Sequence, residues 1–327
     1  MNQDPIVDFL GDEDWDSPFF KKLAHNDTGK AVGHQGGIVV PKELRPFFPE
    51  LHEDQTTTRK PTIDRTLSIE MYAGVRHVAA AQVRYQFQTW GGTRSAESRI
   101  TDNLGPLRNI AGEGDFLLFQ RRADALNRFR LILIQKGSPQ FAGIASWLAG
   151  RKWGPLSVDQ PPVTQAEILT AAQDLNLMAG RPFVLTNSEV PRVETRQLKI
   201  ARGSVFPQCV RYEYGRTCCV SGIIIGTPRQ LFEVEAAHVV PVSEGGMDDI
   251  RNGLALTQTL HWAFDRGLFG IKADRTIYLP RQVKVMTENT YLKQFEGRPI
   301  SEAKSKPLRV HADALNWHIQ NRVKQWE

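Results

Sequence analysis

The feature that most constrains the fold of this chain is the stretch 232–267, in which a strand-like run, a loop and a helix-like run follow one another. The apolar run ends at His238, and a loop containing Pro and two Gly comes next. Residues 257–266 have the length of a short helix, contain neither Pro nor Gly, and are followed by a glycine that acts as a stop signal. His261 and Asp265 stand at positions i and i+4 of this run, so their side chains lie on one face of the predicted helix.

These residue types suit hydrolysis assisted by a metal ion. A histidine nitrogen and a carboxylate oxygen on one helix face are ligands for a hard or borderline divalent cation. His238 can supply a neutral imidazole as general base near physiological pH. Taken singly, each residue has a more ordinary interpretation: a histidine packed in a core, an ion pair on a helix surface, or, for Asn252 before a glycine, a plain turn. The joint spacing favours a catalytic site.

The motifs AAH, GG-x-D, NGLAL and LH-x-AFD-x-G follow one another at this spacing. The stretch resembles the HNH nucleases, whose ββα-metal fold hydrolyses phosphodiester bonds. The resemblance implies that His238 is the general base, that Asn252 braces the loop and orients the base, and that His261 and Asp265 hold a metal ion. Mg²⁺ is the expected cofactor, with Mn²⁺ or another divalent ion as the alternative.

The sequence departs from the HNH pattern at two places. Relatives usually carry a ligating Asp or His just before the base, where this chain has Ala237. Water, a DNA phosphate or another side chain such as Glu235 would then complete the metal shell. Many relatives also carry Cys pairs for a structural zinc, and the corresponding positions are Thr257 and Leu260. No structural zinc is therefore expected.

The composition is that of a soluble protein with two domains. The chain has 327 residues, of which 41% are hydrophobic and 24% charged. It has no apolar run long enough to span a bilayer, and its acidic start is not a signal peptide, so a cytoplasmic location is expected. The net charge of +5 favours a polyanionic partner. The three cysteines form neither a disulfide framework nor a zinc pair, and adjacent Cys218 and Cys219 are expected to be buried as small hydrophobes.

Residues 1–16 are acidic and are expected to be poorly ordered, whereas the region that follows is rich in β-forming residues. Strands are predicted over 62–73, 82–89, 115–120 and 129–135, with a further short strand over 37–40. A glycine-led turn between two of these strands carries Arg94, Glu97 and Arg99, and such side chains read guanine and cytosine in a major groove. Four arginines near the next hairpin suit phosphate contacts: Arg121, Arg122, Arg128 and Arg130. The alternative for both groups is a solvated charged loop.

The motifs KKLAHNDTG, GHQGG and QFQTWGGTRSAESRIT occur in this order within the first third of the chain. Together they resemble the N-terminal effector domain of EcoRII-type restriction endonucleases, a B3-like β-pseudobarrel that grips duplex DNA with two arms. The resemblance implies that the first arm contains or is braced by Lys22, Asn26, Asp27, His34 and Gln35, and that the second arm reads bases through Arg94, Glu97 and Arg99. The second arm is one residue longer here, so a target sequence does not carry over.

Local patterns predict the remaining elements of the chain. A helix is expected over 164–178, opened by a capping box, and a second over 208–214. Residues 268–272 and 276–279 are expected to pair as a hairpin, and apolar residues at helical spacing predict a helix over 312–326, from which Trp317 falls off the apolar stripe. The predicted organisation is an α+β chain with a B3-like recognition domain at 1–155, a linker at 156–193 and an HNH domain at 194–327.

The sequence thus predicts a sequence-specific type II restriction endonuclease that cuts double-stranded DNA in defence against foreign DNA and leaves 5′-phosphate ends. Because one HNH site cuts one strand, cutting a duplex favours a homodimer. Two alternatives stay open. The first is an endonuclease directed to methylated cytosine or other modified DNA, and the second is a DNA-binding regulator whose nuclease domain is inactive, which the absent ligand at Ala237 would favour.

Overall fold

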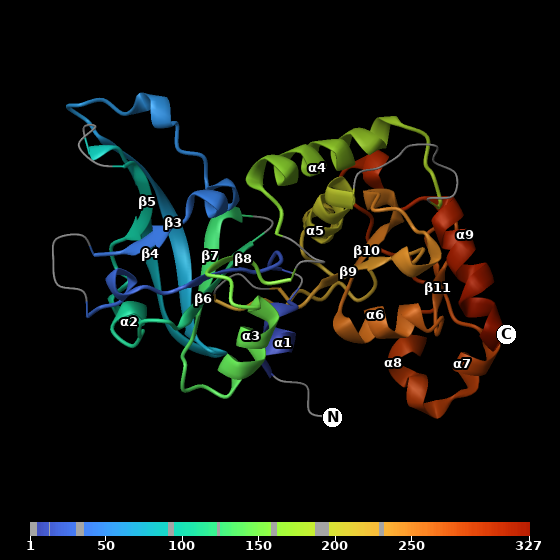
Figure 1. Ribbon diagram of the computed structural model, residues 1–327. Helices are drawn as coiled ribbons and strands as arrows, with labels where there is room; N and C mark the ends of the chain where they lie inside the picture. Colours follow the sequence, from blue (N-terminus) through green and yellow to red (C-terminus); the bar gives the residue numbers. More distant parts are fainter. Residues whose placement is uncertain are drawn as a thin grey trace. The chain divides into compact units, whose positions relative to one another are not determined.

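A computed structural model describes the chain over residues 5–12, 14–30, 36–90, 95–122, 125–157, 162–186, 196–228 and 232–327. The chain divides into two compact units, Met1–Glu167 and Ile168–Glu327. Both helices and strands are present, which confirms the predicted α+β class (Figure 1). The predicted linker at 156–193 stays a prediction. Within the ranges above, no helix combines the length and the apolar character that a membrane crossing requires.

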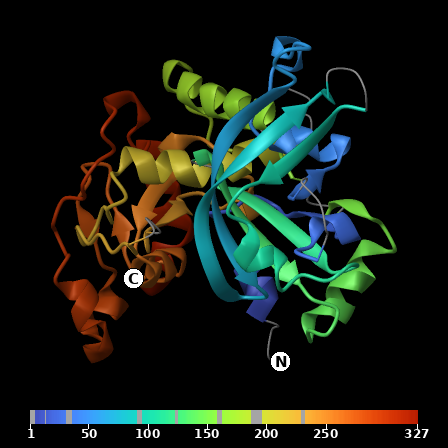
Figure 2. The same ribbon diagram turned by 90° about the vertical axis from the view of Figure 1, so that its left-hand side faces the viewer.

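Unit 1 is built on one curled sheet of eight strands in the order β2-β5-β4-β3-β7-β6-β1-β8 (Figures 1 and 2). All neighbours are antiparallel except β3 and β7, which are parallel. The strands are β1 Phe19–Lys22, β2 Ile38–Val40, β3 Thr62–Ala73, β4 Arg76–Gln88, β5 Glu97–Thr101, β6 Phe116–Arg122, β7 Ala125–Ile134 and β8 Trp153–Pro155. The predicted strands are confirmed, and β4 begins earlier than its sequence pattern indicated. The curled half-barrel is the shape expected of a B3-like pseudobarrel.

Short helices accompany this sheet. They are α1 Pro5–Leu10, α2 Gly105–Arg108 and α3 Gln140–Leu148, with 3-10 turns η1 His25–Asp27, η2 Lys42–Phe47 and η3 Glu53–Gln55.

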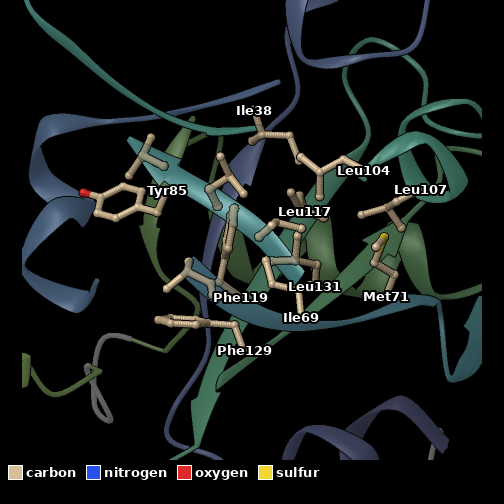
Figure 3. Close-up of a cluster of buried hydrophobic side chains, with 14 of the residues drawn as sticks. Ile38, Ile69, Met71, Tyr85, Leu104, Leu107, Leu117, Phe119, Phe129 and Leu131 are labelled. Atoms are coloured by element: carbon tan, nitrogen blue, oxygen red, sulfur yellow. The ribbon is translucent and has the colours of Figure 1, made fainter. Parts of the chain in front are cut away.

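Successive residues of the central strands belong to two separate hydrophobic cores, because neighbouring side chains in a strand point to opposite faces of the sheet. Phe19, Phe119 and Leu131 belong to the core enclosed by the curl, which Figure 3 shows in close-up. Phe20 and Ile132, each next to one of these residues in sequence, belong to a second core that α1 and α3 cover. Both faces of β1, β6 and β7 are therefore buried, and this part of the sheet is a rigid base for the loops.

The prediction of a poorly ordered N-terminus is wrong for the described part of residues 1–16. Trp15 and Asp16 are buried, and Asp16 forms an ion pair of 2.7 Å with Arg121, which is itself fully buried. Arg122 and Arg130 are also buried, and the Arg130 guanidinium lies over the Trp15 ring. The prediction that these three arginines contact phosphate is therefore wrong, because they hold the acidic N-terminal segment against the sheet.

Unit 2 is mostly helical around a small hairpin. Its elements are η5 Met178–Gly180, α5 Arg196–Glu213, β9 Glu235–His238, η7 Val242–Glu244, η8 Ile250–Asn252, β10 Gly253–Leu256, α6 Gln258–Asp265, β11 Gly270–Ile271, β12 Ile277–Tyr278, α7 Arg281–Val285, η9 Thr287–Asn289, α8 Thr290–Lys293, η10 Lys306–Leu308, α9 Ala312–Asn321 and η11 Val323–Trp326. Helix α4, Gln165–Leu177, spans the boundary between the units. Both α5 and α6 pack against the β9–β10 hairpin (Figure 1).

The sequence predictions for unit 2 hold with two corrections. The helix over 164–178 is confirmed, and its capping box is formed by Thr164 and Glu167. The helix predicted over 208–214 begins much earlier, at Arg196, and runs through Pro207. The helix predicted over 312–326 is broken at Arg322, after which the chain continues as a 3-10 turn. The hairpin near residue 273 is confirmed, and Cys218 and Cys219 are buried as expected.

Candidate active site

Strands β9 and β10 place His238 opposite Gly253 at the end of a short antiparallel hairpin where the connecting loop begins and ends. Asn252 precedes that glycine and is fully buried. Its side-chain oxygen accepts from the backbone nitrogen of Val240 at 2.9 Å, and its Nδ2 donates to the carbonyls of Val240 and Met247, both at 3.0 Å. One amide therefore ties together both ends of the loop that follows His238, which is the place where the sequence predicts a brace.

The His238 ring is held on two sides. Its Nε2 lies 3.0 Å from Oδ1 of Asp248, and because a carboxylate only accepts, Nε2 carries the proton. The ring also stacks on Phe206 from helix α5, with centroids 3.9 Å apart and planes 16° apart. These contacts fix the ring and its tautomer, and they leave the lone pair of Nδ1 as the group that can accept a proton.

Gly253 explains how Phe206 reaches this position. A Cβ atom on Gly253 would lie 2.5 Å from Cγ2 of Val210 and 2.9 Å from Cζ of Phe206, which is closer than real side chains approach. The absence of a side chain lets α5 pack directly on the hairpin, so Phe206 lies beneath the imidazole of His238. The glycine of the NGLAL motif is thus required by packing against α5 rather than by an unusual backbone angle.

His261 on helix α6 is held in the same way by a different carboxylate. Its Nδ1 lies 2.7 Å from Oε2 of Glu235 on β9, so Nδ1 donates to this carboxylate. This hydrogen bond lowers the pKa of Glu235 below its ordinary value, although partial burial acts in the opposite direction. The other ring nitrogen, Nε2, lies 3.6 Å from Oδ2 of Asp265, one turn along α6. The predicted pair therefore does lie on one helix face.

This donor set fits a divalent cation. His261 offers an imidazole that a carboxylate orients through its Nδ1, an arrangement that is usual around metal-binding histidines. Asp265 offers a half-exposed carboxylate beside it. Within the ranges that the structure describes, no three His, Cys, Asp or Glu side chains cluster closely enough to enclose an ion. The protein would thus supply two ligands, and water or substrate oxygens would supply the others.

Ala237, the position at which relatives carry another ligand, is fully buried and pairs with Leu254. Glu235 lies on the same face of β9, two residues earlier, since side chains alternate along a strand. Of the three candidates to complete the metal shell, Glu235 has one oxygen already engaged by His261. The geometry favours water and phosphate.

In unit 1, Asp27 is the centre of the predicted first arm, and it is buried. Its carboxylate accepts from Lys21 Nζ at 2.7 Å and from the backbone nitrogens of Ala24 and Val39, both at 2.9 Å. Burial lowers the pKa of Lys21, and the neighbouring Asp27 opposes that shift. The burial of Asp27 favours a bracing role. Lys22 and Asn26 are exposed next to it and are available to a partner.

The second predicted arm adjoins the first through the sheet. Arg99 on β5 pairs with Val39 on β2, so the strands that follow both arms are neighbours. Arg99 is buried, and its Nε donates to Oε1 of Glu97 at 2.6 Å. The other predicted readers lie outside the described residues: His34, Gln35 and Arg94. The structure thus brings Glu97 and Arg99 together but leaves their role in base reading a prediction.

Two residues that the sequence reasoning did not assign belong to the candidate site. Asp248 is the acidic residue of the GG-x-D motif, so its spacing was visible although its role was not. Phe206 carried no sequence signal, because it lies 32 positions before His238 and the helix that presents it was expected to begin only at residue 208.

Two family models match parts of this chain. Residues 218–272 match the model of the HNH endonuclease family, and residues 15–125 match the model described as restriction endonuclease EcoRII, N-terminal. Among solved structures, the chain is similar to the modification dependent TagI restriction endonuclease, with 13% identity and a TM-score of 0.33 over 91% of this chain and 80% of that one. It is also similar to the N-terminal domain of Helicobacter pylori LlaJI.R1, with 10% identity and a TM-score of 0.26 over 42% of this chain and 95% of that one. No curated protein matches the chain.

Proposed function

We propose that this chain, which carries an EcoRII-type N-terminal domain and an HNH endonuclease domain, is a site-specific restriction endonuclease that cuts double-stranded DNA. One observation carries the proposal: two imidazoles lie on one hairpin and its helix, each with one nitrogen bound to its own carboxylate. This geometry supports His238 as the base and His261 as a metal ligand. A DNA-binding regulator would need neither.

In the proposed reaction, Nδ1 of His238 takes a proton from a water molecule whose oxygen attacks the scissile phosphorus. A new P–O bond forms as the bond from phosphorus to the 3′ oxygen breaks, and the leaving oxygen takes a proton from solvent. The products are a 5′-phosphate and a 3′-hydroxyl. A divalent ion, proposed to be Mg²⁺, stabilises negative charge on the phosphate and on the leaving oxygen when it is bound by His261 and Asp265. A homodimer would supply one site for each strand.

The test is digestion of unmodified phage DNA and of a fully cytosine-methylated copy, each with Mg²⁺ and with EDTA. Discrete fragments that require Mg²⁺ and arise from unmodified DNA are the expected result. Cleavage of the methylated copy alone would replace this proposal with a modification-dependent endonuclease. A chain that binds DNA but cuts neither copy would be a regulator.

The base is tested in the same assay with His238→Ala, which removes general-base catalysis. The expected loss in cleavage rate is about 10²- to 10⁴-fold, while DNA binding in EDTA stays at the wild-type level. The matched control is His52→Ala, which removes an exposed imidazole from unit 1. Cleavage by the His238→Ala variant at the wild-type rate would show that His238 is not the base.

A further inference from the structure

The C-terminal segment Ala312–Glu327, here named the C-terminal clamp, contacts the last turn of α6 at several points. A helix end leaves backbone carbonyls without partners inside the helix. His318 Nε2 donates to the carbonyl of Phe264 at 2.9 Å, and its ring lies parallel to the Phe264 ring at 3.7 Å. Trp326 Nε1 donates to the carbonyl of Arg266 at 2.8 Å. The clamp therefore donates hydrogen bonds to carbonyls on both sides of Asp265, the last residue of α6.

The backbone of the clamp also approaches the end of α6 closely. Gly267 has φ +67°, a left-handed angle that favours glycine, and it ends the helix. A Cβ atom at this position would lie 2.2 Å from the backbone oxygen of Arg322. Farther along, a Cβ on Gly270 would lie 3.0 Å from side-chain atoms of Ile319 and Val323. These two glycines let α9 and η11 pack directly on the segment that follows α6.

Arg322 links this contact to the loop that follows His238. Its guanidinium forms an ion pair with Glu244, which lies in η7 between His238 and Asn252. The same guanidinium lies over the ring of Trp317, 5.5 Å from its centroid. Arg322 therefore touches the end of α6 with its main chain and the base loop with its side chain. Trp317 lies off the apolar stripe of its helix, and this contact with Arg322 explains its place.

We propose that the C-terminal clamp is part of the nuclease site, and that Arg322 is a positioning residue that fixes the Asp265 carboxylate relative to the His238 loop. The family match ends at residue 272, so the clamp lies outside the part of the chain that matches HNH endonucleases. Asp265 lies at a helix terminus, where backbone hydrogen bonds break most easily. Its side chain is half exposed, so little packing restrains it. Misplacement of a reacting group by about 1 Å can cost about 10²-fold in rate.

The inference rests on the proposed function, and its test therefore includes metal binding measured apart from cleavage. The variants are Arg322→Ala, Arg322→Lys and Glu244→Ala, in the full chain. The readouts are Mn²⁺ affinity by calorimetry without DNA, kcat and KM for DNA cleavage, and the melting temperature. Arg309→Ala is the matched control, since Arg309 forms a comparable half-exposed ion pair with Glu302 at 2.6 Å.

Arg322→Ala is expected to weaken Mn²⁺ binding by about 10-fold and to lower kcat by about 10- to 100-fold with little change in KM. Its melting temperature should stay within about 4 °C of wild type, since an exposed ion pair contributes little to stability. Glu244→Ala should lower kcat to the same extent, Arg322→Lys should restore part of it, and Arg309→Ala should change nothing.

Wild-type kcat and Mn²⁺ affinity in the Arg322→Ala variant would overturn the proposal. A loss of kcat that appears equally in Arg309→Ala, or that follows a fall in melting temperature, would also overturn it, because the clamp would then be merely structural. If the wild type binds Mn²⁺ but cuts no DNA, the endonuclease proposal fails while the Mn²⁺ affinities of the variants still decide the role of the clamp.

Discussion

The protein is expected to lose stability between pH 7 and pH 5, and His318 accounts for about 2 kcal/mol of that loss. Replacing His318 with Phe should make the loss smaller by this amount. His318 is buried on α9, where its Nε2 donates to the Phe264 carbonyl. Its Nδ1 is also buried and has no hydrogen-bond partner among the described residues. Protonation would place a charged N–H group there without an acceptor.

Burial lowers the pKa of His318 to about 4 from its ordinary 6.5, the hydrogen bond to Phe264 opposes this shift, and Arg322 adds to it. Below pH 6.5 the unfolded chain takes up a proton that the folded chain refuses until about pH 4. The free energy of unfolding therefore falls as the pH falls through this window. At 1.36 kcal/mol for each pH unit the full loss is about 3 kcal/mol, of which about 2 kcal/mol falls between pH 7 and pH 5.

The assay is urea denaturation at both pH values, with hydrogen exchange of peptides from α6 and α9 reporting the unfolding of unit 2. Phe keeps a ring against Phe264 and cannot titrate, so the comparison is the pH-dependent loss in wild type minus the loss in His318→Phe. Other titrating groups cancel in that difference. The exposed His52→Phe variant is the control. Equal losses in His318→Phe and wild type, within about 0.5 kcal/mol, would show that His318 is not held neutral by burial.

Two further predictions concern the carboxylates at the centre of each unit. Glu235→Gln keeps the size of the side chain but removes the charge that fixes the His261 tautomer, so Mn²⁺ affinity measured by calorimetry should fall about 10- to 100-fold, and an unchanged affinity would count against this role. Asp27→Asn leaves the buried Lys21 ammonium without its ion pair and should lower the free energy of unfolding of unit 1 by about 3–5 kcal/mol in urea denaturation. The exposed neighbour Asn26→Ala should change it by no more than about 0.5 kcal/mol, and equal effects of the two substitutions would contradict the bracing role of Asp27.

The sequence predicted those parts of the structure whose signals are local. The helix that carries His261 was visible because its length, its lack of Pro and Gly, and Gly267 all agree within about ten residues. The strands of unit 1 were visible because they are rich in β-branched, aromatic and Leu residues. In both cases, neighbouring residues in the chain determine the local conformation, so a short window of sequence is sufficient.

The predictions from sequence were wrong for residues whose contact partners lie far away along the chain. The acidic N-terminus has the composition of a solvated segment, yet Asp16 meets Arg121 across 105 positions. The same arginine was expected to contact phosphate, since a count of charges does not show which face of a strand a side chain occupies. The C-terminal clamp was missed for the same reason, because His318 meets Phe264 across 54 positions.

The surroundings of the two site histidines show why the spacing of residues in the sequence could not identify all the groups that would coordinate a metal ion. Each proposed role depends on which ring nitrogen donates to a carboxylate, and these carboxylates lie 10 positions from His238 and 26 from His261. The chain has no donor at Ala237, but it has a carboxylate two residues earlier on the same face of β9, and that carboxylate engages the far nitrogen of His261 instead. An acidic side chain at the buried position 237 would have to be desolvated against Leu254. A carboxylate two residues earlier on the strand would keep its charge near the proposed ion and would leave coordination positions to water and to a substrate phosphate.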